Sequence, residues 1–178
     1  MSDVNIPTLD DLEFLSYLNE QGSIDENLQG KIGVYAIFDE AKMLQFVGYS
    51  RDIYLSLKQH LVRQPDKCYW LKLQTIDRPS RTVLEATKQQ WMTENEGIPE
   101  GKQTVESVWT DPIDAKLTMT DEDKIAYENQ DELGKIKFLK SVARKLETEI
   151  QEKLSDRGVK MEIRFNPKLK EQGLLDLK

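Results

Sequence analysis

Two short apolar segments in the first third of the chain constrain its fold most strongly. Residues 33–39 (GVYAIFD) and 43–49 (MLQFVGY) are rich in β-branched and aromatic residues, and only Glu40, Ala41 and Lys42 separate them. Two such segments joined by a connection of three residues are typical of a β-hairpin. The sequence therefore predicts two neighbouring antiparallel strands.

The amino-terminal segment before this hairpin contains leucines at helical spacing. Four leucines recur at every third position within residues 8–19. Thr8 stands in front of them, and threonine is a favoured residue at the start of a helix. The pattern predicts a helix over residues 8–19.

The segment after the hairpin predicts helix, strand and helix in turn. Ser50 and Asp52 are both suitable N-caps for a helix that ends at Asp66. Residues 68–76 alternate between apolar and polar side chains, and a second helix is expected over about residues 81–95. This order predicts an α/β chain of the α+β type, with a small three-stranded sheet flanked by helices.

The carboxy-terminal part predicts a helix followed by a strand. Residues 103–132 are acidic and weakly periodic, with a short helix expected at 121–128. Residues 135–156 place their apolar side chains on one helical stripe, and Gly158 suits a left-handed C-cap. Residues 161–165 alternate as a half-buried strand does.

The charge distribution supports a division into three parts. Residues 1–28 carry seven acidic residues and neither Lys nor Arg, whereas residues 29–104 are slightly basic. Residues 105–178 form the third part, which joins a strongly acidic linker to a basic helix and strand. The formal net charge of −7 therefore comes from two segments, and a locally positive face for nucleic acid stays compatible with it. Ordinary solvated charge is the commoner explanation.

Several classes of protein are excluded by what the chain lacks. Cys68 is the single cysteine and His60 the single histidine, so an internal disulfide and a zinc site of Cys and His are both excluded. The longest apolar run, residues 34–38, is too short to cross a membrane. Residues 97–103 imitate a phosphate-binding loop but lack its Ser or Thr. Without an export or transit signal at the amino end, we expect a cytoplasmic protein with no membrane contact.

Two residue triplets and one histidine carry a resemblance to a known family. Residues 33–35 (Gly-Val-Tyr) and 46–48 (Phe-Val-Gly) are separated by ten residues, and His60 follows on the next predicted helix. Their order and spacing resemble the GIY-YIG nuclease superfamily, whose two triplets lie on neighbouring strands. The resemblance covers about residues 29–104.

A closer resemblance comes from longer stretches of the same region. The stretches GVYAIFD, LQFVGYSRDI and PDKC together look like the domain at the amino end of some chloroplast monothiol glutaredoxins. The Cys-Gly-Phe-Ser motif of the glutaredoxin half is absent from this chain. The thiol chemistry of those fusions therefore cannot be carried over to this chain, and the resemblance implies only the nuclease-like fold.

The superfamily resemblance implies positions for five site residues. Two tyrosines, an arginine, a histidine and a metal-binding glutamate surround the scissile phosphate in those nucleases. By this resemblance Tyr35 and His60 are the retained catalytic positions. Phe46, Ser56 and Gln90 replace the second tyrosine, the arginine and the glutamate. A neutral amide is a poor magnesium ligand. We therefore expect no metal and no cofactor, with magnesium required only if the chain is a nuclease.

Three hypotheses about function follow, and they leave open whether the chain is an enzyme. The first is a catalytically impaired GIY-YIG-type domain that binds nucleic acid or a protein, with Arg51, Arg63 and Lys67 as candidate binding residues. The second is a magnesium-dependent endonuclease with a rearranged site around Tyr35 and His60. The third is an assembly protein that uses its carboxy-terminal helix and strand.

Overall fold

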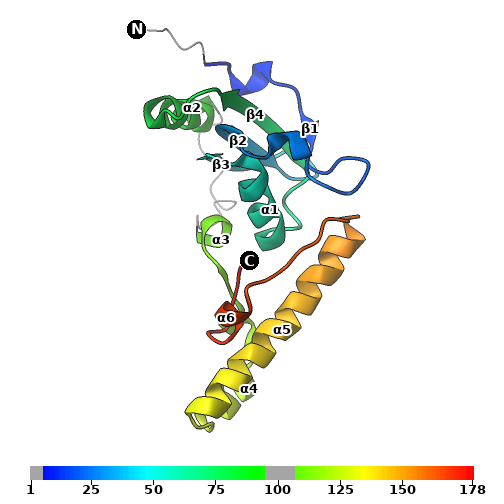
Figure 1. Cartoon of the computed structure of the whole chain (residues 1–178), viewed down its shortest axis with the longest axis vertical. Helices are drawn as coiled ribbons and strands as arrows, with labels where there is room; N and C mark the ends of the chain where they lie inside the picture. Colours follow the sequence, from blue (N-terminus) through cyan, green and yellow to red (C-terminus); the bar gives the residue numbers. More distant parts are fainter. Residues whose placement is uncertain (1–5, 95–106) are drawn as a thin grey trace. The chain divides into compact units, whose positions relative to one another are not determined.

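The computed structural model of the chain describes residues 6–94 and 107–178. The chain folds as two compact units, Met1–Trp109 (unit 1) and Thr110–Lys178 (unit 2). Figure 1 traces both along the chain, from blue at the amino end to red at the carboxy end. The predicted boundary between residues 104 and 105 and the loop-like segment at residues 97–103 lie outside the described residues.

Unit 1 is built around an antiparallel sheet with the strand order β1-β4-β2-β3. The strands are β1 (Leu15–Ser16), β2 (Ile32–Phe38), β3 (Leu44–Ser50) and β4 (Trp70–Ile76). The α+β class, the predicted hairpin and the predicted third strand are confirmed. The short strand β1 adds a fourth strand to the sheet that we predicted with three.

The two faces of this sheet are covered by different helices (Figure 1). In β2, Val34 belongs to the apolar cluster that includes Leu84 and Trp91 of α2 (Arg81–Glu94). The next residue, Tyr35, is hydrogen-bonded to α1 (Ile53–Arg63). Because successive side chains of a strand point to opposite faces, α1 and α2 lie on opposite sides of the sheet.

Helix α1 forms because its cap and its apolar stripe agree. Asp52 is the N-cap, and its side chain accepts a hydrogen bond from the backbone N–H of Leu55 at 3.2 Å. Ile53, Leu57 and Leu61 recur at every fourth position and are fully buried, so one helical face packs on the sheet. The prediction of a helix starting after Ser50 or Asp52 is confirmed, with Asp52 as its N-cap.

The helix predicted over residues 8–19 is wrong. Only a single 3₁₀ turn, η1 (Leu9–Asp11), follows the Thr8 cap, and the chain then pairs as β1 with β4. The Tyr17 hydroxyl donates to the backbone oxygen of Leu57. Long-range anchoring of this kind overrides local helical spacing. Of the four leucines only Leu9 is buried, whereas Leu15 is 46% exposed.

Residues 6–28 belong to unit 1. The Trp91 indole N–H donates to the backbone oxygen of Pro7 at 3.0 Å, and the Lys72 ammonium donates to that of Leu9 at 2.9 Å. The Leu9 N–H in turn donates to the Glu94 carboxylate at 2.7 Å. The segment thus packs against both α2 and β4.

Unit 2 is organised along one long helix. Its elements are β5 (Ile113–Asp114), η3 (Ala115–Thr118), α4 (Asp121–Glu128), α5 (Glu132–Asp156), α6 (Pro167–Lys170) and β6 (Leu174–Leu175). The predicted helices at 121–128 and 135–156 are confirmed, and the second begins three residues earlier than expected because Asp131 caps it. Gly158 has a φ of 84°, which confirms the predicted left-handed residue after this helix.

The strand predicted over residues 161–165 is wrong. Only an isolated bridge joins Phe165 to Leu177, although Phe165 is buried and Arg164 is exposed as the alternation requires. The Gln151 side chain, on α5, donates to the backbone oxygen of Ile163 at 3.2 Å. The segment is therefore extended but lies along a helix instead of a long partner strand. No helix of residues 6–94 and 107–178 is long and apolar enough to cross a membrane.

Candidate functional site

The structure brings Tyr35 and His60 into direct contact, although they lie 25 residues apart. Tyr35 lies in β2, opposite Gly48 of β3, and His60 lies near the carboxyl end of α1. The Tyr35 hydroxyl oxygen is 2.7 Å from His60 Nε2. Both side chains are buried, with exposed fractions of 3% and 4%. The two positions retained from the family resemblance therefore form one hydrogen-bonded pair.

The partners of this pair determine where its protons lie. His60 Nδ1 is 2.8 Å from the backbone oxygen of Trp109. A carbonyl only accepts hydrogen bonds, so Nδ1 carries the imidazole proton and Nε2 accepts from the Tyr35 hydroxyl. Burial, together with the positive charge of Arg63, lowers the pKa of His60 to about 4. Burial also raises the pKa of Tyr35 above its ordinary value. Both side chains are therefore neutral at pH 7.

Trp109 closes this face of the sheet. It lies in α3 (Ser107–Thr110), and its ring stacks on Phe46 with ring centres 5.2 Å apart and an interplanar angle of 10°. It also meets the His60 ring edge-on at 5.7 Å and is itself only 1% exposed. The Tyr35–His60 pair is thus sealed beneath an indole, and a phosphodiester has no access to it in this structure.

Sequence reasoning missed Trp109 as part of this site. The residue falls in the acidic, weakly periodic segment, for which no structure beyond a short helix was predicted. A single large aromatic residue in an otherwise polar segment was the available signal, because burying such a ring is strongly favourable.

The glycines of both triplets are required by close packing. A Cβ atom at Gly48 would lie 2.9 Å from the Tyr35 hydroxyl oxygen and 2.8 Å from Cε1 of Phe46. A Cβ atom at Gly33 would clash with the backbone oxygen of Gln74 on β4. Gly48 therefore makes room for the Tyr35 side chain, and Gly33 lets two strands approach each other.

We expect Gly48→Ala to lower the free energy of unfolding by about 1–3 kcal/mol, the usual cost of overpacking a core. Urea denaturation followed by tryptophan fluorescence measures the effect. Combining it with Tyr35→Phe removes the hydroxyl oxygen, one of the three atoms nearest to the new methyl group, so the double variant should recover part of the loss. Equal stability of Gly48→Ala and the unaltered chain would contradict the packing described here.

The other family positions divide between the two sheet faces. The Ser56 hydroxyl, on α1, lies 2.7 Å from that of Ser50, and its hydrogen bond to Tyr35 partly offsets the rise in the pKa of that residue. Gln90 lies on α2, which covers the opposite face, and its amide nitrogen is 3.5 Å from the Glu94 carboxylate. The structure therefore gathers Tyr35, Phe46, Ser56 and His60 and leaves Gln90 away from them.

The three candidate binding cations do not form one patch. Arg63 donates to the backbone oxygen of Trp109 at 2.8 Å, and the Lys67 ammonium lies 3.5 Å from the side-chain oxygen of Gln45. Arg51 precedes α1, whereas Arg63 ends it. The helix has 11 residues, so about 16 Å of helix separates them at a rise of about 1.5 Å per residue. Arg51 and Arg63 therefore lie at opposite ends of α1.

Metal-ligating side chains do not gather in the described residues. Among them, no group of three or more His, Cys, Asp or Glu side chains lies close enough to hold a metal ion. Cys68 is fully buried, and its sulfur is 3.6 Å from the backbone oxygen of His60. Its position is that of a core residue.

Comparison with known proteins finds similarity to one stretch of a plant protein. No family model matches the chain. Over 70 residues the chain is 34% identical to the bifunctional monothiol glutaredoxin-S16, chloroplastic, of Arabidopsis thaliana. The match covers 39% of this chain and 24% of that protein, so the chain spans about a quarter of the length of its relative. The chain thus shares a partial similarity with a chloroplast monothiol glutaredoxin, in keeping with the resemblance that its sequence suggested.

Proposed function

We propose that unit 1 is a GIY-YIG-like domain that no longer cleaves phosphodiesters and serves as a binding module. One observation carries this proposal: the Trp109 ring seals the Tyr35–His60 pair beneath a stack with Phe46. A nuclease must bring its scissile phosphate within hydrogen-bond distance of its catalytic groups. The buried pair offers no such approach.

The protonation of the pair supports the same conclusion. The Tyr35 proton is already donated to His60, and the imidazole donates in turn to the Trp109 carbonyl. The low pKa of His60, about 4, also keeps positive charge away from the position where a phosphate would sit. Tyr35 and His60 are therefore a neutral pair in the core, and they make hydrogen bonds to each other and to the Trp109 backbone.

The residues at the three replaced family positions lack the groups that phosphodiester cleavage requires. Phe46 has no hydroxyl, and Ser56 has no positive charge to stabilise the transition state. Losing one well-placed electrostatic contributor costs on the order of 10²–10³ in rate. Gln90 supplies no carboxylate for a metal, and it lies on the other side of the sheet from Tyr35. A Gln90→Glu substitution alone would therefore not rebuild a metal site beside Tyr35.

A cleavage assay tests the proposal. We expect the full chain to leave labelled single-stranded, duplex and branched DNA intact in magnesium or manganese. The Tyr35→Phe variant is the matched control, because it removes one hydroxyl and keeps the ring. Cleavage by the unaltered chain that disappears in Tyr35→Phe would contradict the proposal.

The second candidate function is a nuclease with a rearranged site, and the 2.7 Å contact between Tyr35 and His60 favours it. In that case the site works only when Trp109 leaves it. Cleavage by Trp109→Ala that is lost again in the Trp109→Ala, Tyr35→Phe double variant would support this second candidate. Inactivity of a Trp109→Ala chain that urea denaturation shows to be folded under the assay conditions would support the loss of catalysis.

A further inference from the structure

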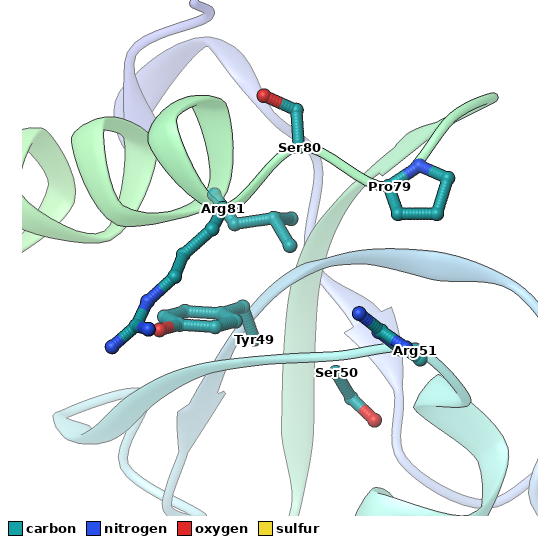
Figure 2. Close-up of a pocket in the computed structure, with 7 residues that line it drawn as sticks. Tyr49, Ser50, Arg51, Pro79, Ser80 and Arg81 are labelled. Atoms are coloured by element: carbon teal, nitrogen blue, oxygen red, sulfur yellow. The ribbon is translucent and has the colours of Figure 1, made fainter.

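A cavity opens between the end of β3 and the start of α2. It has a volume of about 350 Å³ and is lined by residues 49–51, residues 79–81 and Leu84 (Figure 2). Leu84 belongs to the apolar cluster on the α2 side of the sheet. The cavity is therefore separate from the Tyr35–His60 pair, which lies on the α1 side.

The described residues that line this cavity include two arginines and no acid. Arg51 and Arg81 are the charged residues that line it. Neither guanidinium takes part in a hydrogen bond or an ion pair with any residue in the ranges 6–94 and 107–178. Asp52, which follows Arg51 in the sequence, uses its carboxylate to cap α1. Two arginines of like charge that line one cavity favour the entry of an anion.

The two arginines line the cavity from different parts of the chain. Figure 2 shows the Arg81 side chain extending past the ring of Tyr49 from the start of α2, while Arg51 reaches toward the same space from the end of β3. Lys88, further along α2, places its ammonium 5.9 Å from the centre of the Tyr49 ring. Lys88 thus adds a further positive charge beside the Tyr49 phenol, which can itself donate a hydrogen bond.

We propose that this cavity binds a phosphate group of a nucleotide unit. Guanidinium groups form bidentate hydrogen bonds to phosphate oxygens and keep their charge at every physiological pH. Tyr49, Pro79 and Leu84 supply apolar surface beside the two arginines, and the volume exceeds that of a single phosphate, which leaves room for part of the attached nucleoside. The phosphate belongs either to a free nucleotide or to a phosphodiester of single-stranded nucleic acid.

This inference names a ligand for the proposed binding module and in that sense rests on it. The proposal of lost catalysis and the proposal of phosphate binding can be tested separately, because the cavity and the Tyr35–His60 pair lie on opposite faces of the sheet. The cleavage assay with Tyr35→Phe tests whether the chain has lost catalysis. The same variant should leave the affinity of the cavity for its ligand unchanged. Binding without cleavage supports both proposals, and cleavage with intact binding contradicts only the first.

The experiment uses the full chain at low salt with two probes, and with acetate as a control anion. A fluorescein-labelled oligodeoxythymidine measures binding by anisotropy, and inorganic phosphate is titrated while the Nε–H signals of Arg51 and Arg81 are followed by NMR. We expect Arg51→Gln and Arg81→Gln each to weaken the binding of at least one probe by about tenfold, the value of one hydrogen bond between charged groups. Arg144→Gln, at an exposed position of α5, removes the same charge and should change affinity less than twofold.

The two probes distinguish the two sources of the phosphate. Binding of both probes that depends on both arginines indicates a nucleic-acid phosphodiester, and binding of inorganic phosphate alone indicates a free nucleotide or other small phosphate. Failure of both probes to bind overturns the proposal. So does binding that Arg144→Gln weakens as much as Arg51→Gln does, because nonspecific charge then accounts for it. Equal binding of acetate and phosphate at the two arginines points to a carboxylate ligand and overturns it as well.

Discussion

Trp109→Ala is expected to lower the free energy of unfolding of unit 1 by about 3–5 kcal/mol, the usual cost of truncating a fully buried tryptophan. The ring is 1% exposed and stacks on Phe46 at 5.2 Å. Its loss leaves a cavity next to the Tyr35–His60 pair, which the surrounding strands cannot fill by small shifts. Urea denaturation measures the change.

Tryptophan fluorescence reports on this change without interference from unit 2. Trp70, Trp91 and Trp109 are the three tryptophans of the chain, and all three belong to unit 1. Trp109→Phe is the matched control, because a phenyl ring keeps part of the stack on Phe46, and it should cost clearly less than the alanine variant. A loss below about 1 kcal/mol for Trp109→Ala would mean that the ring is not packed against the site.

The stability of unit 1 is expected to fall by about 3 kcal/mol between pH 6.5 and pH 4 because of His60 alone. Burial lowers its pKa from an ordinary value of 6.5 to about 4. Above pH 6.5 the imidazole is neutral in both states and its full contribution is present. Between pH 6.5 and pH 4 the imidazole is protonated in the unfolded chain but stays neutral in the folded chain. The free energy of unfolding therefore falls across this range.

The measurement is helped by the fact that His60 is the single histidine of the chain. NMR of its imidazole gives the pKa directly, and the nitrogen shifts show whether Nδ1 carries the proton. Urea denaturation at several pH values compares the chain with His60→Gln, which lacks this titration, so that the difference between the two curves isolates His60. Tyr35→Phe leaves the His60 imidazole buried, so this variant should keep most of the pH dependence of the free energy of unfolding. Parallel curves for the chain and His60→Gln would show that His60 titrates normally.

Local patterns sufficed to predict the elements that build the sheet and the main helices. The segments of β2 and β3 are short, apolar and separated by three residues, and no other partner lies so near in sequence. Helices α1 and α5 combine a cap with an apolar stripe, and both signals are contained within the element itself. These features depend on neighbours in sequence, so they can be read without the fold.

Where local spacing allowed two outcomes, the tertiary structure chose between them. The leucines of residues 8–19 fit a helix, but pairing of β1 with β4 and burial of Tyr17 draw the segment along the sheet edge. Residues 161–165 alternate like a strand, yet they lie along α5, which offers no strand ladder to pair with. In both cases the partner is distant in sequence, and a periodicity does not say what it packs against.

The candidate site shows the same division. The sequence by itself determined that Tyr35 and His60 stand at spaced positions on a strand and a helix, and that Phe46, Ser56 and Gln90 lack the groups expected there. Only the tertiary structure showed that Trp109, 49 residues beyond His60, covers the pair and accepts its hydrogen bond. It also brought Arg51 and Arg81 to one cavity on the other side of the sheet. Contacts between residues so far apart arise from how the helices pack on the sheet, and no local pattern encodes that packing.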